Sequence, residues 1–425
     1  MMFIKVLKPV FIVILLCWIS LFPEPVHECC SVCTQVILGC FFLIFLFARK
    51  DKRALFSLRD IPLWLFLLAF SGGIMSAQNK AVAVQAYLDV SLTLFFLYYL
   101  CKEVFNSDRN LEFLARAVCL FSIFVSAAAI LEWALGRNPI YEYLVKNPYY
   151  YRYMHGPYRR PMSTQFNPVI LGTYLLACIP FVLVLAKFGL KDKQRSPRYL
   201  GMFSIVLSLP VIALTSSRGV LLGTAALMLF YLWHVGKKRI TALFILSLVL
   251  FMGVCSWPGA GRINRFGVQQ MICGSYDSIF SEYRFTRVRM AAEMLKDYPL
   301  TGIGLKHFRI RFNEYYPHQE PEINEFMVAD NMYLTILAET GITGGAGLFI
   351  FIGWLLWRGQ KCFSGIKEKK KKLFLLAVLS GFIGLLVNMA AYELFYWHVP
   401  LIFFSLYCGL IASRMAVSEV WERRQ

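Results

Sequence analysis

Arg218 is the residue whose position in the sequence most directly suggests chemistry. It lies between two apolar runs, in the short polar turn Thr215-Ser216-Ser217-Arg218-Gly219. An arginine between two segments that cross a membrane is costly and is by default a functional candidate. A broken-helix turn there would direct backbone N–H groups and the guanidinium toward one anion. The alternative is a guanidinium that extends to the outer lipid headgroups without binding a substrate.

The range 258–329 carries a second concentration of positive charge. Its cationic residues are Arg262, Arg265, Arg284, Arg287, Arg289, Lys296, Lys306, Arg309 and Arg311. Guanidinium groups bind phosphate oxygens through paired hydrogen bonds and stay protonated, so clustered arginines suit a pyrophosphate or an acidic sugar. Arg284 and Arg287, one or both, are the candidates to act with Arg218. A solvated basic surface on a long loop is the alternative.

Residues 141–161 interleave tyrosines with cations and include Arg160. Aromatic faces stack on sugar rings, but tyrosine also populates the belts at membrane interfaces. Both interpretations of this segment stay open.

The elements that must position these residues are membrane helices. With 58% hydrophobic and 16% charged residues, the 425-residue chain has too little polar surface for a soluble protein. A crossing of about 30 Å needs roughly 20 apolar residues. About twelve such spans are expected, near 9–22, 32–48, 61–77, 81–100, 111–133, 167–187, 200–215, 219–235, 240–257, 330–357, 373–391 and 396–416. The first is expected to be a retained helix, because no small-residue cleavage site follows it.

The connections between these spans alternate in charge. Cations gather in 49–53, 102–109, 187–198, 237–239 and 358–372. By the positive-inside rule these connections and both termini are cytoplasmic, which places 134–166, 215–219 and 258–329 outside. The net charge of +19 reflects in part this inside bias. Basic loops of this kind indicate contact with anionic lipids and not with nucleic acid.

The cysteines indicate no disulfide framework, because most of the twelve lie in or at the ends of apolar spans, where Cys behaves as a small hydrophobe. Cys29, Cys30 and Cys33 could bind metal or form a bridge. They have no second group of His or Cys at ligand spacing, so we expect neither a metal nor a cofactor.

Three stretches resemble one known family. They are Arg160-Pro-Met-Ser-Thr-Gln-Phe-Asn-Pro and the helix that follows, Leu214-Thr-Ser-Ser-Arg218-Gly, and the run from Arg284 to Gly344, which contains Asp330 and Asn331. The last run matches an H-N-x9-G-x-x-G pattern at Asn331, Gly341 and Gly344. The sequence, from about residue 155 to 357, is similar to the O-antigen ligase and polysaccharide polymerase superfamily.

The resemblance implies an all-α polytopic membrane protein with a GT-C-like fold. Helices 1–9 would lie within 1–257, with an outer loop at 134–166. A periplasmic loop would span 258–329 between helices 9 and 10, and helices 10–12 would follow within 330–425. The family implies a bacterial inner-membrane enzyme that uses a polyprenyl-pyrophosphate glycan donor on the periplasmic side, without nucleotide sugar or metal. The acceptor would be a glycan or a lipid.

The resemblance also assigns roles to residues. Arg218 and Asp330 would be catalytic, while Arg284, Arg287, Arg160 and Asn331 would bind substrate. Where a ligase has His, this chain has Asp330. A carboxylate can also accept a proton from a sugar hydroxyl, and partial desolvation would raise its pKa. Alternatively, Asp330 caps the helix that begins at Asn331.

Glu339, in the same apolar run, could pair with a loop arginine, and a structural pair is the favoured interpretation. The rival functions are a repeat-unit polymerase, which differs from a ligase in its acceptor, and a transporter or flippase. A transporter should show internal hydropathy repeats and charges along a path. Neither is evident in the sequence.

Overall fold

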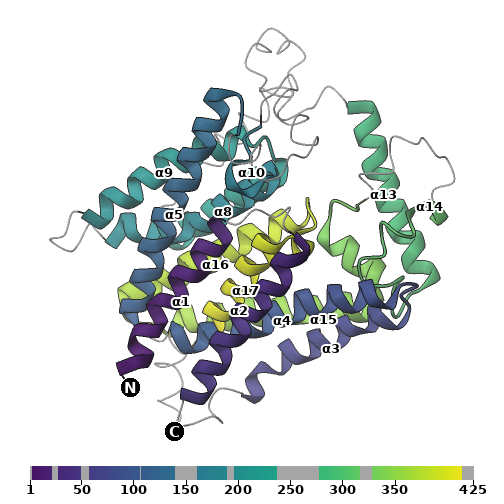
Figure 1. Ribbon diagram of the computed structural model, residues 1–425, viewed down its shortest axis with the longest axis horizontal. Coiled ribbons are helices and arrows are strands. Elements are labelled where there is room, and N and C mark those ends of the chain that lie inside the picture. The colour runs from purple at the N-terminus through teal and green to yellow at the C-terminus, as the bar shows by residue number, and fades with distance from the viewer. Residues whose placement is uncertain are drawn as a thin grey trace.

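The computed structural model describes residues 2–21, 27–48, 57–105, 107–138, 160–188, 196–236, 277–315 and 328–413 (Figure 1). All regular elements in these ranges are helices. The α-helices are α1 (Met2–Leu21), α2 (His27–Ala48), α3 (Ile61–Met75), α4 (Lys80–Val104), α5 (Asp108–Leu135), α8 (Pro168–Phe188), α9 (Ser196–Leu214), α10 (Arg218–His234), α13 (Asp277–Asp297), α14 (Phe312–Tyr315), α15 (Met332–Gly365), α16 (Lys369–Met389) and α17 (His398–Ala412). Short 3-10 helices cover Leu58–Asp60, Ser163–Gln165 and Leu394–Tyr396.

Helices occupy the predicted apolar spans from 9–22 to 219–235 and from 330–357 to 396–416. The span predicted at 240–257 lies outside the described residues. Among the described residues, seven segments could cross a membrane by length and composition: Leu58–Met75, Lys80–Val104, Asp108–Leu135, Pro168–Lys187, Pro197–Leu214, Met332–Gly365 and Lys369–Met389. Leu7–Leu21, Val32–Phe47 and His398–Ala412 are apolar but shorter. The total of twelve crossings remains a prediction, because a short helix reaches less than the hydrocarbon thickness.

Local sequence explains several helix boundaries. Asn79 begins α4 by accepting a hydrogen bond from the Val82 amide at 3.3 Å. Gly136 ends α5 in the left-handed conformation that glycine adopts without steric cost. Part of the range expected to be a loop, 258–329, is the polar helix α13. Its low hydropathy hid it from a search for apolar spans.

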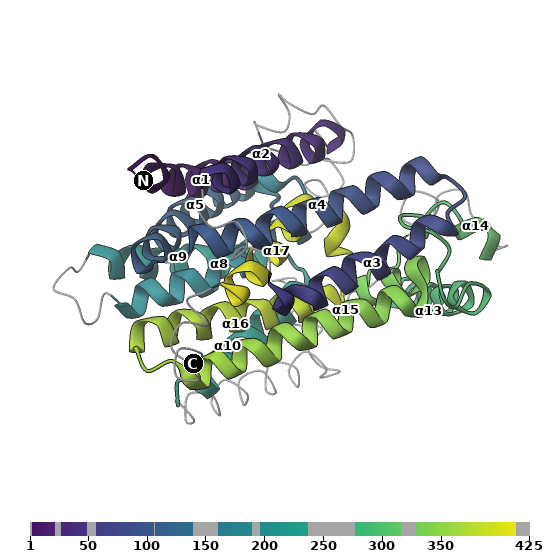
Figure 2. The ribbon, with the colours of Figure 1, turned by 90° about the horizontal axis from the view of Figure 1, so that it is seen from below.

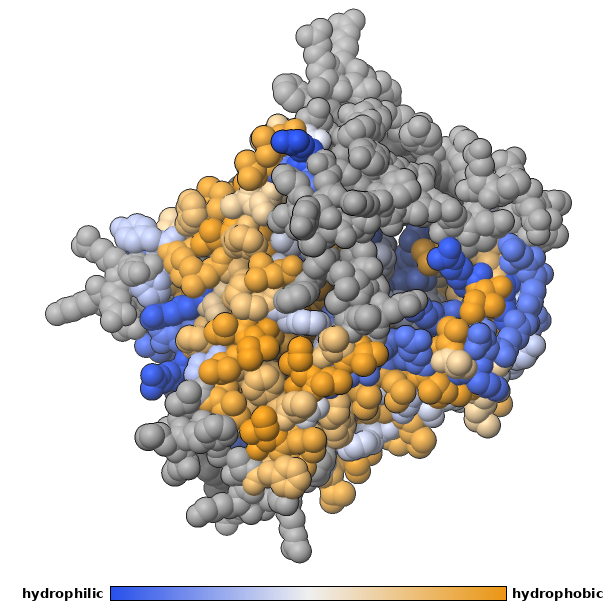
Figure 3. Space-filling model, viewed as in Figure 1, coloured by the Kyte–Doolittle hydropathy of each residue, from blue (hydrophilic) through white to orange (hydrophobic). Residues whose placement is uncertain are grey.

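The helices pack side by side, with α3 against α15, α10 against α16, and α4 against α17. Figure 2 shows α3 and α15 running alongside each other, with α1 and α2 on the opposite face of the array. Hydrophobic side chains cover much of the visible surface in Figure 3, and hydrophilic ones gather over α13 and α14. Further hydrophilic side chains lie at the left edge of the same view, so the visible face is apolar between two polar margins.

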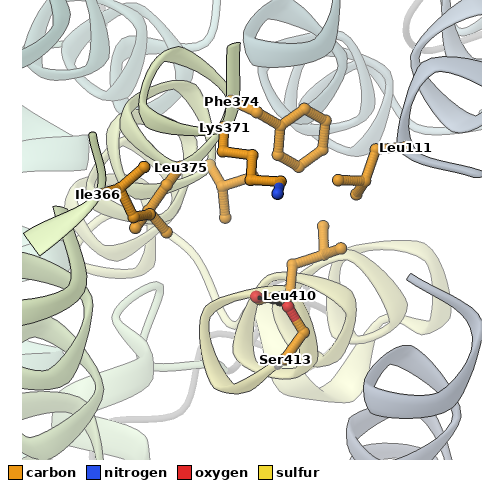
Figure 4. Close-up of a pocket in the computed structure, with 8 residues that line it drawn as sticks. Leu111, Ile366, Lys371, Phe374, Leu375, Leu410 and Ser413 are labelled. Atoms are coloured by element: carbon orange, nitrogen blue, oxygen red, sulfur yellow. Dashed lines mark hydrogen bonds between the residues drawn. The ribbon is translucent and has the colours of Figure 1, made fainter. Parts of the chain in front are cut away.

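Hydrogen bonds define the two ends of the array. At one end, called the site end from here on, the connection after α3 contacts the segment 298–308, and the connection after α9 contacts the segment 160–167. The connection after α16 contacts the segment 328–331 at the same end. At the opposite end, the segment 57–60 lies beside the end of α4, and Arg358 donates to the Ala412 carbonyl at 2.9 Å. A small apolar cavity there lies between α5, α16 and α17, with the Lys371 side chain among Leu111, Phe374 and Leu410 (Figure 4). Its polar lining side chains are Lys371 and Ser413, and the Ser413 hydroxyl donates to the Leu410 carbonyl at 2.8 Å.

Candidate functional site

Asp330 and Arg287 form an ion pair at the site end. The Asp330 carboxylate meets Nη1 of Arg287, with exposed side-chain fractions of 27% and 16%. The helix cap is Asn331, whose Oδ1 accepts from the amides of Tyr333 at 3.0 Å and Leu334 at 3.2 Å. Asn331 therefore fills the capping role that was one interpretation of Asp330, and the Asp330 carboxylate faces the arginine instead.

Glu393 supports this pair from the α16–α17 connection. Its Oε1 accepts from the Ala329 amide at 2.9 Å and from the Thr335 hydroxyl at 2.7 Å. Burial raises the pKa of Glu393 to about 7, and the negative charge of Asp330 adds to this effect. The hydrogen bonds from Ala329 and Thr335 and the positive charge of Arg287 lower the pKa of Glu393. The buried Glu393 carboxyl group thus holds the backbone before Asp330 through the Ala329 amide, and the first turn of α15 through the Thr335 side chain.

Glu339 fixes a second segment at the same end. Its side-chain oxygens accept from the amides of Lys306 at 2.8 Å and Phe308 at 3.0 Å, and also from the Tyr396 hydroxyl. The suggested pairing with a loop arginine is therefore wrong. The 304–308 turn points the N–H groups of Lys306 and Phe308 at the buried carboxylate, and these donors compensate it without a second charge.

Glycines on both sides of the contact, Gly302 and Gly341, allow this segment to approach α15. The amides of Ile303 and Gly304 donate to the carbonyls of Ala338 and Glu339 at 2.9 and 3.0 Å. Gly302 has φ +68°, and a Cβ there would lie 2.2 Å from the Glu339 carbonyl carbon. Gly341, at φ +67°, marks a kink in α15. Only glycine fits such contacts without moving the backbone.

His307 ties the same segment to the α3–α4 connection. Its Nε2 accepts from the Asn79 amide at 2.9 Å, so Nδ1 carries the proton and donates to the Leu305 carbonyl at 2.7 Å. A buried imidazole with both nitrogens occupied in this way is a neutral structural group.

Glu132, on α5, organises the region around Arg160. Its carboxylate accepts from the amides of Met162 and Ser163. Arg160 in turn donates from Nε to the Thr215 carbonyl at 2.8 Å, at the turn that precedes α10. The segment containing Arg160 is thereby connected to the turn containing Arg218.

Arg218 is the first residue of α10, and its side chain is exposed. Within the described part of the chain, it forms no ion pair or hydrogen bond through its guanidinium. Ser217 precedes it without a side-chain capping hydrogen bond. A guanidinium and the first-turn N–H groups of one helix are thus available together, which is a favourable arrangement for an anion.

The α16–α17 connection joins the two parts of the site. Ala391 packs close to Gly219, where a Cβ would lie 2.6 Å from it, and Tyr392 accepts from Asn167 at 3.2 Å. Glu393 then reaches the Ala329 amide. Sequence reasoning missed Glu393, although a carboxyl group in the short break between two apolar spans was a usable signal.

The structure therefore brings Asp330, Asn331 and Arg287 together, and it connects Arg160 to the Arg218 turn. Arg284 lies in α13 three residues before Arg287, and its side chain is outside the described part of the structure. Also outside are residues 139–159, 258–276 and the side chains of Cys29 and Cys30. In the described residues, no group of three or more His, Cys, Asp or Glu could hold a metal ion.

Residues 203–349 match the O-antigen ligase family. The matched range lies inside the stretch 155–357 on which the resemblance was based, and it contains Arg218, Arg287 and Asp330. Comparison with curated proteins finds no relative that matches the chain. The family prediction is confirmed for this range: residues 203–349 carry an O-antigen ligase domain, in a chain with several helices long and apolar enough to cross a membrane.

Proposed function

We propose that this protein transfers a glycan from a polyprenyl-pyrophosphate donor to a glycan or lipid acceptor, on the periplasmic face of a bacterial inner membrane. The observation that carries the proposal is the exposed Arg218 at the start of α10. Its guanidinium has no anionic partner among the described residues, and it is connected to a second charged centre, Arg287 with Asp330.

The donor pyrophosphate is the anion that Arg218 would bind. A guanidinium and helix N–H groups together match phosphate oxygens. Arg160, close to the same turn, and one or both of Arg284 and Arg287 on α13 would add contacts to the donor. These groups would stabilise the negative charge that develops on the pyrophosphate as it leaves.

Asp330 would act on the acceptor. Its carboxylate would accept the proton of the acceptor hydroxyl while that oxygen attacks the anomeric carbon. The bond to the pyrophosphate oxygen would break on the opposite face of the sugar, which inverts the anomeric configuration. Arg287 would orient the carboxylate, and Asn331 would lie beside the acceptor. Because the donor is already activated, positioning and electrostatics account for most of the catalysis.

The proposed topology places Arg218, the range 258–329 and Asp330 outside, with both termini in the cytoplasm. Leu300 is 64% exposed and suits a single-cysteine label. In a background without native cysteines, Leu300→Cys should react with a membrane-impermeant maleimide in intact cells whose outer membrane has been permeabilised. Reaction only after the inner membrane is broken would contradict the mechanism.

A deletion strain tests the reaction and separates a ligase from a polymerase. Lipid-linked and surface glycans would be compared by gel electrophoresis and mass spectrometry. Full-length chains that accumulate on the lipid carrier indicate a ligase, whereas single repeat units indicate a polymerase. Unchanged lipid-linked and surface glycans would exclude both reactions.

A further inference from the structure

Asp330 has a backbone conformation that its surroundings must maintain. Its φ is +49°, in the left-handed region, which few residues other than glycine adopt, although aspartate and asparagine do so more often than the rest. Such conformations persist where neighbouring contacts hold them. On the C-terminal side, the Asn331 cap fixes the start of α15. On the N-terminal side, the contact is the hydrogen bond from the Ala329 amide to Glu393.

Glu393 is a buried hydrogen-bond acceptor beside the backbone of Asp330. Its side chain is buried, with 7% of the residue exposed. Its Oε1 receives two donors, the Ala329 amide and the Thr335 hydroxyl, which lie on either side of Asp330. A nearby contact, from the Phe395 amide to Sδ of Met332 at 3.3 Å, holds the same connection against α15.

We infer that Glu393 is a positioning residue, which fixes the backbone ahead of Asp330 so that the Asp330 carboxylate faces Arg287 and the acceptor hydroxyl. This inference rests on the proposed function. Glu393 has no proton-transfer role in this proposal, in which its Oε1 holds the Ala329 amide and the Thr335 hydroxyl.

Glu393 can accept the hydrogen bond from Ala329 whether its own carboxyl group is neutral or ionised. Asp330, Arg287, Glu339 and Tyr396 are the titratable groups that interact with it. Its pKa of about 7 means that both the neutral and the ionised form are present near neutral pH. Either form retains an oxygen that can accept from Ala329, so the position of Asp330 need not change.

Two conservative variants separate positioning from acid–base chemistry. Glu393→Gln keeps the acceptor oxygen at the same reach but loses the charge. Glu393→Asp keeps a carboxylate but withdraws its oxygens by one methylene. A positioning role predicts that Gln is more active than Asp, whereas an acid–base role predicts the reverse order. Both substitutions are small and polar, so the comparison does not depend on a large cavity.

The assay would use full-length protein in native membranes, with lipid-linked glycan extracted from the deletion strain as donor and acceptor membranes from the same strain. We expect Glu393→Gln to stay within about threefold of wild type and to keep the wild-type pH profile. Glu393→Asp should lose roughly 10- to 100-fold, since a displacement of about 1 Å can cost 100-fold. Glu103→Gln, at the opposite end, is the control for an unrelated carboxylate.

A result with Asp as active as Gln, or more active, would overturn the inference while the proposed function stands. The same holds if both variants match wild type. Absence of transfer by the wild-type protein would instead remove the proposed function, and the inference with it. Immunoblots of each membrane preparation normalise the rates to protein level.

Discussion

The two ends of the helix array compensate their buried carboxyl groups in different ways. At the opposite end, Asp60 is fully buried and pairs with Lys102 at 2.8 Å, with the Tyr98 hydroxyl donating to it at 2.7 Å. At the site end, the buried groups Glu132, Glu339 and Glu393 accept from backbone amides and hydroxyls instead. None of these three forms an ion pair within the described residues.

The arginines and lysines at the two ends differ in the same way. A carboxylate that takes amide hydrogen bonds holds a loop in place without engaging an arginine or a lysine. At the site end, Arg218 is left without a carboxylate partner among the described residues, whereas Lys102 at the opposite end is engaged by Asp60. The site end therefore combines rigid loops with available positive charge, which is what an anionic substrate needs. The opposite end uses its ion pair for structure.

The largest effect that would distinguish the two ends is expected for Lys102→Met. This substitution removes the cation and leaves Asp60 buried with only neutral partners. We expect a loss of about 3–5 kcal/mol in unfolding free energy, typical of breaking a buried pair. Thermal unfolding in detergent measures it. Arg116→Met, in an exposed pair with Glu112, is the control and should change little. Equal losses of unfolding free energy for the two variants would show that the buried Asp60 pair stabilises the fold no more than an exposed pair.

Arg218→Lys tests whether the site end binds phosphate through a planar guanidinium. An ammonium keeps the charge but cannot make two parallel hydrogen bonds. We expect transfer to fall about 100- to 1000-fold at normal protein level, as for loss of one donor to a developing oxyanion. Arg289→Lys, in an exposed pair with Glu293 on α13, is the matched control. Near-normal surface glycan in the Arg218→Lys strain would favour an arginine that only reaches lipid headgroups.

Asp330→Asn tests the carboxylate at the site end. The variant should fold, because Asn331 provides the helix cap and asparagine tolerates a positive φ. An amide cannot accept the proton, so transfer should fall about 100-fold. Asp330→His, the residue of the ligases, should keep part of the activity. Full activity of Asp330→Asn at normal level would remove Asp330 from the chemistry and leave a site of arginines.

Gly302→Ala should destabilise the packing of residues 298–308 on α15 at the site end, without affecting the opposite end. The added Cβ would meet the Glu339 backbone, and the positive φ disfavours alanine. We expect a loss of about 1–3 kcal/mol in unfolding free energy. Gly353→Ala, on the same helix α15 as Glu339, is the control, because a Cβ there meets nothing within 4 Å. If both variants unfold like wild type, close packing of residues 298–308 on α15 is not a source of stability.

The sequence alone determined the helical membrane class and the positions of the described apolar helices. Both depend on hydrophobic length, which is a local property. It also located the Arg218 turn, because a cation between apolar runs is visible without any contact. Three stretches together indicated the family, the most specific being the spacing of Asn331, Gly341 and Gly344, and the match to residues 203–349 confirms it.

The tertiary structure alone decided which charged groups meet. Arg287 and Asp330 are 43 residues apart, and Glu393 reaches Ala329 from 64 residues away, across the break between α16 and α17. Sequence reasoning suggested that Glu339 could pair with a loop arginine, because a buried carboxylate needs compensation. It could not foresee backbone amides as the partners, since every residue except proline carries one and only the folded loop directs it. The polar helix α13 was likewise hidden, because its contacts and not its hydropathy hold it at the site end.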